Sequence, residues 1–139
     1  MIVLDTNVVS EPSQARPCKV VIDWFAAQDA SQLFTTTPTE AELQYGLALM
    51  PAGRRRDELE KALQHFLATE LDQRILPFDG VAAREFGAVA AARRKAGLQI
   101  KVFDSQIAAI ARAHRAAVAT RDVADFEHSG VAIINPWNI

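Results

Sequence analysis

The fold is decided by the first seven residues, Met1-Ile2-Val3-Leu4-Asp5-Thr6-Asn7 (MIVLDTN). The run from Ile2 to Leu4 is short, apolar and partly β-branched, which is typical of a buried strand. Asp5, Thr6 and Asn7 follow it at once, and such residues favour turns and helix caps. In α/β proteins, ligands bind in the crevice beyond the carboxyl ends of the parallel strands. Asp5 is therefore the first candidate site residue.

Later acidic residues repeat this placement. Each stands where an apolar run gives way to a turn or a helix start: Glu42, Asp79, Asp104 and Asp122. Carboxylates that share one crevice repel one another unless a counter-charge is present. A hard divalent cation, which prefers oxygen ligands, is the natural counter-charge. The sequence therefore predicts a metal site, although Asp79, just before Gly80, is best explained as a helix cap.

Strand and helix patterns alternate along the whole chain. Apolar runs predict strands at residues 2–4, 33–36, 75–78, 117–120 and 131–134. Three- and four-residue spacing predicts helices at 20–27, 39–50, 54–71, 81–96 and 104–115, with a turn or short helix at 122–126. Pro77 makes the third strand an edge or irregular strand. This alternation predicts an α/β fold with parallel strands and helices on both faces of the sheet.

Length and composition indicate one soluble domain, residues 1–139. Half of the residues are hydrophobic, which is enough for a sizeable core. No apolar run approaches the ~20 residues of a membrane span. The N-terminus lacks the charged leader and cleavage site of a signal peptide, so we expect a cytoplasmic protein. The single cysteine, Cys18, cannot form an internal disulfide.

Basic residues are concentrated in one part of the chain. The net charge is −2, yet residues 84–121 carry eight basic and two acidic residues, whereas residues 1–83 carry seven basic and twelve acidic residues. A basic flank can hold phosphates without reading sequence. A solvated helix face explains Arg93-Arg94-Lys95 equally well.

Three of the candidate acids have a purely structural alternative. Asp5 could cap its own turn. Glu42 could close a capping box with Thr39, and from the pattern alone this is the stronger explanation. Asp104 could be the N-cap of the helix that follows it. No single acid is therefore a specific signal, and only the set of them at strand ends indicates a metal site.

Five segments, in order along the chain, resemble those of one family: MIVLDTNVVSE (1–11), TEAELQYGL (39–47), FDSQIAAIA (103–111), VATRDVADF (118–126) and INPWNI (134–139). Together they resemble the PIN-domain ribonucleases, specifically the VapC-like toxins of toxin–antitoxin pairs. The NPW ending is most similar to the FitB-like branch. The resemblance implies a single PIN domain with three layers, α/β/α, in which helices flank a parallel sheet of about five strands.

The resemblance also implies roles for individual residues. The catalytic acids would be Asp5, Glu42, Asp104 and Asp122. Of these, Asp5, Asp104 and Asp122 would hold Mg²⁺ or Mn²⁺, and Asp125 is an alternative to Asp122. Supporting polar groups would come from Thr6, Asn7, Ser105 and Thr120. Arg121, beside the site, is the first candidate for a phosphate contact.

The implied activity is that of a toxin, a ribonuclease that hydrolyses RNA with a metal-activated water. The implied partners are a cognate antitoxin, which is a small DNA-binding protein, and a second copy of the chain within a larger assembly. The apolar hairpin at 39–71 would offer the antitoxin a groove. Two alternatives stay open: a PIN module that binds its partner without catalysis, and an aspartate-nucleophile phosphohydrolase. The second is disfavoured because Asn7 stands where that class has a second Asp.

Overall fold

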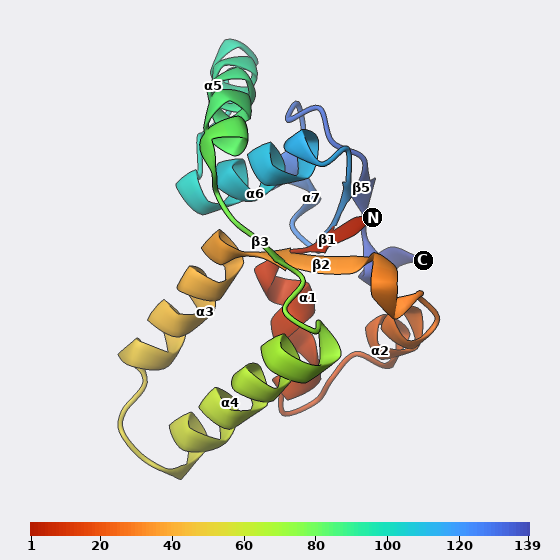
Figure 1. The fold of residues 1–139 in the computed structure, drawn as a ribbon, viewed down its shortest axis with the longest axis vertical. Coiled ribbons are helices and arrows are strands. Elements are labelled where there is room, and N and C mark those ends of the chain that lie inside the picture. Colours follow the sequence, from red (N-terminus) through yellow and green to blue (C-terminus); the bar gives the residue numbers. More distant parts are fainter.

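A five-stranded parallel sheet organises the computed structural model, which describes residues 1–139 (Figure 1). The strand order is β3-β2-β1-β4-β5, and every pairing is parallel. The strands are β1 (Ile2–Leu4), β2 (Leu33–Thr36), β3 (Ile75–Leu76), β4 (Ala117–Ala119) and β5 (Ile133–Ile134). The central position of β1 puts Asp5 in the middle of the carboxyl edge of the sheet.

Seven helices connect the strands. They are α1 (Thr6–Ser10), α2 (Lys19–Ala26), α3 (Thr37–Leu49), α4 (Arg54–His65), α5 (Gly80–Lys95), α6 (Val102–Ala113) and α7 (Val123–Phe126). A π-helical turn, Phe66–Glu70, continues α4, and 3₁₀ turns lie at Glu11–Ser13, Ala30–Gln32 and Pro136–Asn138. None of the helices combines the length and the apolar character that a membrane span requires.

The helices cover both faces of the sheet, so the architecture has three layers. Helices α5, α6 and α7 lie on one face, and α1 to α4 lie on the other (Figure 1). Because successive side chains of a strand point to opposite faces, Val3 and Leu4 of β1 enter different cores. Val3 packs with Ile107 of α6 and its neighbours, whereas Leu4 packs with Val8 of α1 and Leu63 of α4. The predicted α/β/α fold is confirmed.

Two predicted helix starts are wrong. Helix α3 begins at Thr37, because the Thr36 hydroxyl caps it by accepting the Thr39 N–H at 3.2 Å, and Pro38 fits the first turn. The capping box between Thr39 and Glu42 therefore does not exist, and the Glu42 carboxylate is free for another role. Helix α6 begins at Val102, so Asp104 lies in its first turn and is not a cap.

The remaining elements either have the predicted boundaries or are shorter than predicted. Asp79 is the N-cap of α5, as predicted, and its carboxylate accepts the Ala82 N–H at 3.0 Å. The strand with Pro77 beside it, β3, is an edge strand, also as predicted. The strand expected at 131–134 is limited to Ile133–Ile134. Helix α1, directly after Asp5, was not predicted.

Candidate active site

Four acidic side chains meet at the carboxyl edge of the sheet. Each arrives from a different element: Asp5 follows β1, Glu42 lies in α3 after β2, Asp104 lies in the first turn of α6, and Asp122 follows β4. From β1 the chain crosses first to β2 on one side, and later returns to β4 on the other side. The acids therefore surround the point where the strand order reverses, which is the usual ligand position in such sheets.

Asp5 is the most constrained of these acids. Its side chain is 3% exposed, and both carboxylate oxygens accept hydrogen bonds. Oδ1 accepts the Thr6 N–H at 2.7 Å, and Oδ2 accepts the Thr120 hydroxyl at 2.7 Å and the Asn7 amide at 3.1 Å. Burial raises the pKa of Asp5 from 3.8 to about 6. The hydrogen bonds from Thr120 and Thr6 lower this pKa, and the charges of Glu42 and Asp122 raise it further.

Asn7 connects three of the site residues. Its amide nitrogen lies 3.1 Å from Asp5 Oδ2, 3.2 Å from Thr120 Oγ1 and 3.2 Å from Asp122 Oδ2. Its amide oxygen accepts the backbone N–H of Arg121 at 3.1 Å. Thr120 Oγ1 in turn accepts the Asp122 N–H at 3.0 Å. Asn7 therefore ties the turn after β4 to the turn after β1, and it orients two carboxylates at once.

Asp104 differs from Asp5 because its carboxylate makes no hydrogen bond or ion pair. It is only partly buried, yet its pKa is raised from 3.8 to about 7. Burial is the main cause, followed by the charges of Asp5, Asp125 and Glu42, while Lys101 lowers the value. Asp104 is therefore within electrostatic reach of three other carboxylates.

Asp122 and Asp125 have different surroundings. The Asp122 carboxylate contacts Asn7, whereas Asp125 forms an ion pair with Lys101, with Nζ and Oδ2 2.7 Å apart. The hydrogen bond to Asp125 is the main cause of the raised pKa of Lys101. Lys101 is not among the residues predicted for the site, although it lies one helical turn before Asp104. This arrangement favours Asp122 as the fourth acid.

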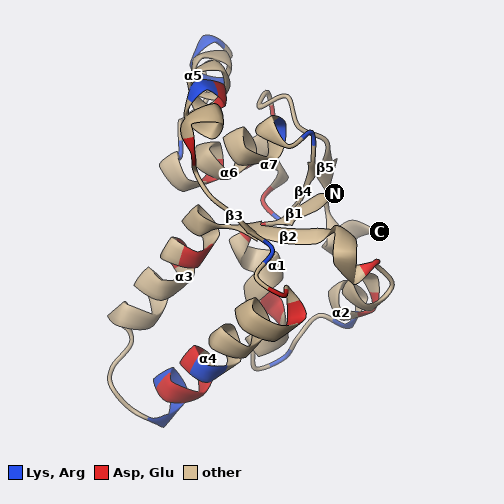
Figure 2. Ribbon diagram, viewed as in Figure 1, with Lys and Arg blue, Asp and Glu red and all other residues tan.

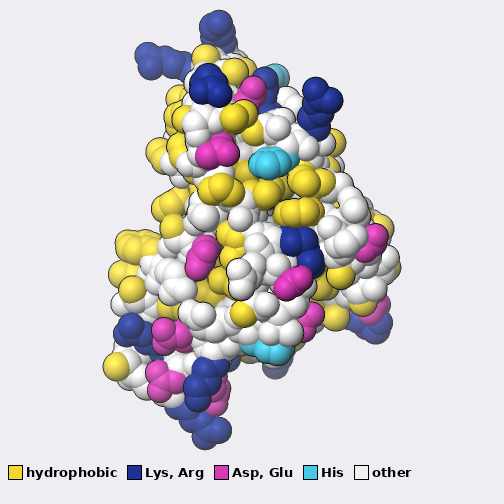
Figure 3. Space-filling model, in the orientation of Figure 1, with side chains coloured by type: hydrophobic (Ala, Val, Ile, Leu, Met, Phe, Trp, Pro, Cys, Tyr) yellow, Lys and Arg dark blue, Asp and Glu magenta, His cyan; other side chains and the backbone are white.

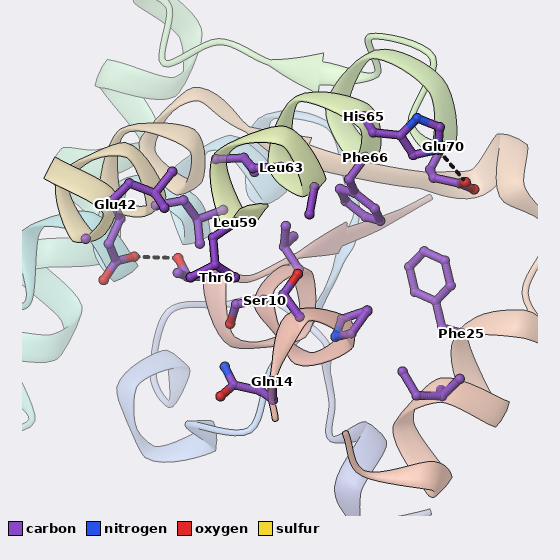
Figure 4. A pocket seen from close by; sticks show the side chains of 18 of the residues that line it. Thr6, Ser10, Gln14, Phe25, Glu42, Leu59, Leu63, His65, Phe66 and Glu70 are labelled. Carbon is purple, nitrogen blue, oxygen red and sulfur yellow. Dashed lines mark hydrogen bonds and ion pairs between the residues drawn. The ribbon is translucent and has the colours of Figure 1, made fainter. Parts of the chain in front are cut away.

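Glu42 and Ser105 complete the set of predicted side chains. The Glu42 carboxylate accepts a hydrogen bond from the Thr6 hydroxyl, and Figure 4 shows this pair at one end of a pocket. Ser105 is 2% exposed, and its hydroxyl has no hydrogen-bond partner. The structure thus connects Thr6, Asn7 and Thr120 directly to the acids, but it does not do so for Ser105.

The pocket beside Glu42 is a groove of about 760 Å³ between α1, α2, α3 and α4. Thr6 and Glu42 lie at one end, and His65 and Glu70 lie at the other (Figure 4). Most of the remaining lining is apolar, with residues such as Ile22, Phe25, Leu43, Leu47, Met50, Leu59 and Phe66. Of the four acids, Glu42 therefore borders an apolar groove.

The donor set suits a hard cation. Every candidate ligand is a carboxylate oxygen, and no His or Cys lies among them, which fits Mg²⁺ or Mn²⁺ better than zinc. No group of three or more His, Cys, Asp or Glu side chains is placed so closely that it could hold an ion directly. Because Mg²⁺ uses only one or two carboxylates directly and keeps several waters, this looser spacing is compatible with such an ion.

The basic residues are divided between structural and exposed positions. Figure 2 marks basic residues at the far end of α5 and at the tip of the α3–α4 hairpin, and Figure 3 shows basic side chains at the same two ends of the molecule. Arg93 is buried and donates to the backbone carbonyls of Gln99, Ala124 and Glu127, and Arg112 pairs with Glu85. The run from 84 to 121 is thus not a uniform phosphate-binding flank.

Comparisons with known proteins agree with this geometry. The family model described as PIN domain matches residues 2–130. The chain is 45% identical over 137 residues to the VapC ribonuclease Y4jK of Sinorhizobium fredii, which covers 99% of this chain and 98% of that protein. It is 44% identical over 137 residues to the plasmid stability protein StbB of Pseudomonas syringae pv. tomato, which covers 99% of both chains.

A solved structure extends the agreement to three dimensions. The crystal structure of FitAcB from Neisseria gonorrhoeae contains a chain with a TM-score of 0.92 and 35% identity, and the match covers 100% of both chains. The toxin FitB of the same organism is 36% identical over 138 residues. With its acids at the carboxyl edge of a parallel sheet and with these full-length relatives, the chain belongs to the PIN-domain family, in the branch that includes the VapC and FitB toxins.

Proposed function

We propose that this chain is a toxin that hydrolyses RNA phosphodiester bonds at Asp5, Glu42, Asp104 and Asp122, with Mg²⁺ or Mn²⁺ as cofactor. One observation carries the proposal. Four carboxylates gather at one edge of the sheet, and burial and neighbouring carboxylates raise the pKa values of Asp5 and Asp104 to about 6 and about 7, so the charge of Lys101 does not balance the ionised site. The ribonuclease name of one close relative gives independent support.

Asp5, Asp104 and Asp122 would hold the ion, in part through water. When bound, the ion would lower the pKa of a bound water and offset the charge that develops on the phosphate oxygens. The protein's part is orientation. Thr6, Asn7 and Thr120 hold the Asp5 carboxylate through three hydrogen bonds that they donate to it, and the Thr6 hydroxyl also donates to Glu42. The Asn7 amide, which contacts both carboxylates, fixes the position of Asp122 relative to Asp5.

The second part of the proposal concerns inhibition. One solved structure that is 34% identical to this chain is described as FitAB bound to a DNA fragment, and another with the same fold is described as a toxin–antitoxin complex from Klebsiella pneumoniae. The apolar groove beside Glu42 fits the apolar face of a partner helix, and the carboxylate at its end fits a basic side chain of that partner. A cognate antitoxin seated there would cover the site.

The third part is self-association. Large apolar side chains are exposed on α3 and α6, outside the groove: Tyr45, Leu49, Val102 and Phe103. They give a second copy of the chain an apolar surface, so we propose a homodimer. Sedimentation of the isolated chain measures its mass directly, and a monomer at all concentrations would contradict the dimer.

Activity of the antitoxin-free protein tests the nuclease. Purified chain is incubated with single-stranded RNA in the presence of Mg²⁺, Mn²⁺ or a chelator, beside the Asp104→Asn variant. We expect cleavage with an ion and none with the chelator. The variant, which loses no hydrogen bond, should fold normally and cleave at least about 100-fold more slowly, since metal catalysis supplies several kcal/mol. Equal cleavage by the two proteins would contradict the assignment.

A further inference from the structure

Arg121 stands beside the carboxylates, and its side chain is held by an aromatic ring. It directly follows Thr120 and precedes Asp122, and its backbone N–H is fixed by Asn7. Its exposed guanidinium lies over the Trp137 ring, 5.3 Å from the ring centroid. The guanidinium makes no hydrogen bond or ion pair with the protein, so its donors point to solvent. An aromatic face fixes the plane of the cation without using any of these donors.

Three other cations of the chain are already engaged. Lys101, beside the acids, pairs with Asp125, and Arg93 is buried among backbone carbonyls. Arg112 pairs with Glu85 and lies near Met1 and Ala117, at the opposite edge of the sheet. A polyanion that approaches four carboxylates is repelled by them, so the site needs a cation with unused donors. Arg121 supplies one at this edge of the sheet.

The position of Trp137 gives the contact a direction. Trp137 follows β5, which is the strand next to β4 at the edge of the sheet. The guanidinium of Arg121 therefore extends from the acids toward the β5 side, away from Glu42, which lies on the β2 side. An RNA strand that lay across the carboxyl edge of the sheet would pass the acids and then Arg121.

We propose that Arg121, seated on Trp137, binds a backbone phosphate of the RNA strand next to the bond that is cut. This inference rests on the proposed function, because it assigns a contact of the same substrate. Arg121 is a binding residue in this proposal, and Trp137 is the positioning residue that holds it. The contact reads charge and geometry rather than base identity, so it adds affinity without sequence preference.

Binding is measured first, with cleavage prevented. A fluorescein-labelled single-stranded RNA is titrated with protein in chelator at salt concentrations from about 50 to 200 mM. We expect Arg121→Ala to weaken binding about tenfold and to reduce the slope of log K against log salt by about 0.7, as for one lost phosphate contact on a single strand. Arg121→Lys should keep the slope and lose less affinity, because it keeps the charge but not the flat contact with the ring.

Arg115→Ala is the matched control, since Arg115 is an exposed arginine before β4, at the opposite edge of the sheet. It should change neither the affinity nor the slope by as much as Arg121→Ala. Trp137→Leu, which keeps bulk but removes the aromatic face, should lower the affinity about threefold and leave the slope unchanged. If Arg121→Ala and Arg115→Ala bind alike, or if Trp137→Leu binds as tightly as the unmodified protein, the proposal is overturned.

Cleavage is measured second, with Mg²⁺ or Mn²⁺ present. Arg121→Ala should raise KM and leave kcat within about twofold, because a contact with a phosphate that does not itself react contributes equally to binding of the substrate and of the transition state. A protein that binds RNA in an Arg121-dependent way but cuts none would refute the proposed function and leave this contact standing. A protein that cuts RNA without any dependence on Arg121 would refute this contact and leave the proposed function standing.

Discussion

Replacing Asp104 by Asn should stabilise the metal-free protein at neutral and alkaline pH. The Asp104 carboxylate makes no hydrogen bond, so the amide costs no lost contact. Its pKa in the folded protein is about 7, against an ordinary value of 3.8. Between these two pH values the unfolded chain releases the proton while the folded chain keeps it. The free energy of unfolding therefore decreases as the pH rises through this window, and the loss is complete above about pH 7.

The size of the effect follows from the shift. A raise of about 3 units corresponds to about 4 kcal/mol at 1.36 kcal/mol per unit. Because Asp104 is partly exposed, solvent screening reduces this to about 2 kcal/mol. For a chain of this length, that is a shift in Tm of roughly 6 to 10 °C. The Asn variant has no titrating group at position 104. The difference between its Tm and that of the unmodified protein should therefore be small near pH 4 and should reach this size near pH 8.

The assay is thermal unfolding in chelator at a series of pH values, for the unmodified protein and for Asp104→Asn. Added Mg²⁺ should raise the Tm of the unmodified protein at pH 8 by binding the folded state, and it should raise the Tm of the variant less. Asp79→Asn is the control, because Asp79 is an acid outside the site. A variant that is no more stable than the parent at pH 8, or one whose advantage does not grow with pH, would refute the electrostatic reasoning.

Three further predictions concern other parts of the molecule. Asn7→Ala should lower RNA cleavage by about 10- to 100-fold, since Asn7 orients Asp5 and Asp122, whereas its Tm should fall by only a few degrees; a parental rate would contradict its role. Arg93→Met should lower the free energy of unfolding by about 3 kcal/mol in urea titrations, because three backbone carbonyls lose the charged donor that the buried Arg93 side chain supplies; a change below about 1 kcal/mol would show that water replaces it. Leu59→Glu, in the groove, should weaken co-purification with the cognate antitoxin at least about tenfold, whereas Val81→Glu, exposed on α5 outside the groove, should not; equal effects would place the partner elsewhere.

Much of the fold could be predicted because local patterns and the global topology agree. Short apolar strands that end in Asp or Thr, separated by helical spacing, leave few alternatives to a parallel sheet. The failures lie where a nearby residue overrides a pattern. The Thr36 hydroxyl and Pro38 start α3 two residues earlier than the Thr39 pattern suggests. Such competition between adjacent caps depends on backbone geometry, which spacing does not contain.

The site was predictable as a set of acids but not as a network. The position of each acid after an apolar run or near a helix start could be read from the chain, and so could the polar side chains of Thr6 and Asn7 next to Asp5. The hydrogen-bond or ion-pair partner of each side chain could not be read from the chain. Asn7 and Asp122 form a hydrogen bond although they are 115 positions apart in the sequence. Lys101 forms its ion pair with Asp125 rather than with Asp104 because α6 packs against α7. Arg121 and Trp137 likewise meet only after β4 and β5 pair.

In the proposed function these carboxylates form one metal-dependent nuclease site. Asp5 is the most buried of them, so the decisive experiment measures cleavage of single-stranded RNA by the antitoxin-free chain and by Asp5→Asn, each with Mn²⁺ and with chelator. We expect only the unmodified protein with the ion to cut RNA at a measurable rate. Cleavage that persists in chelator, or that Asp5→Asn leaves unchanged while the variant remains folded, would contradict it.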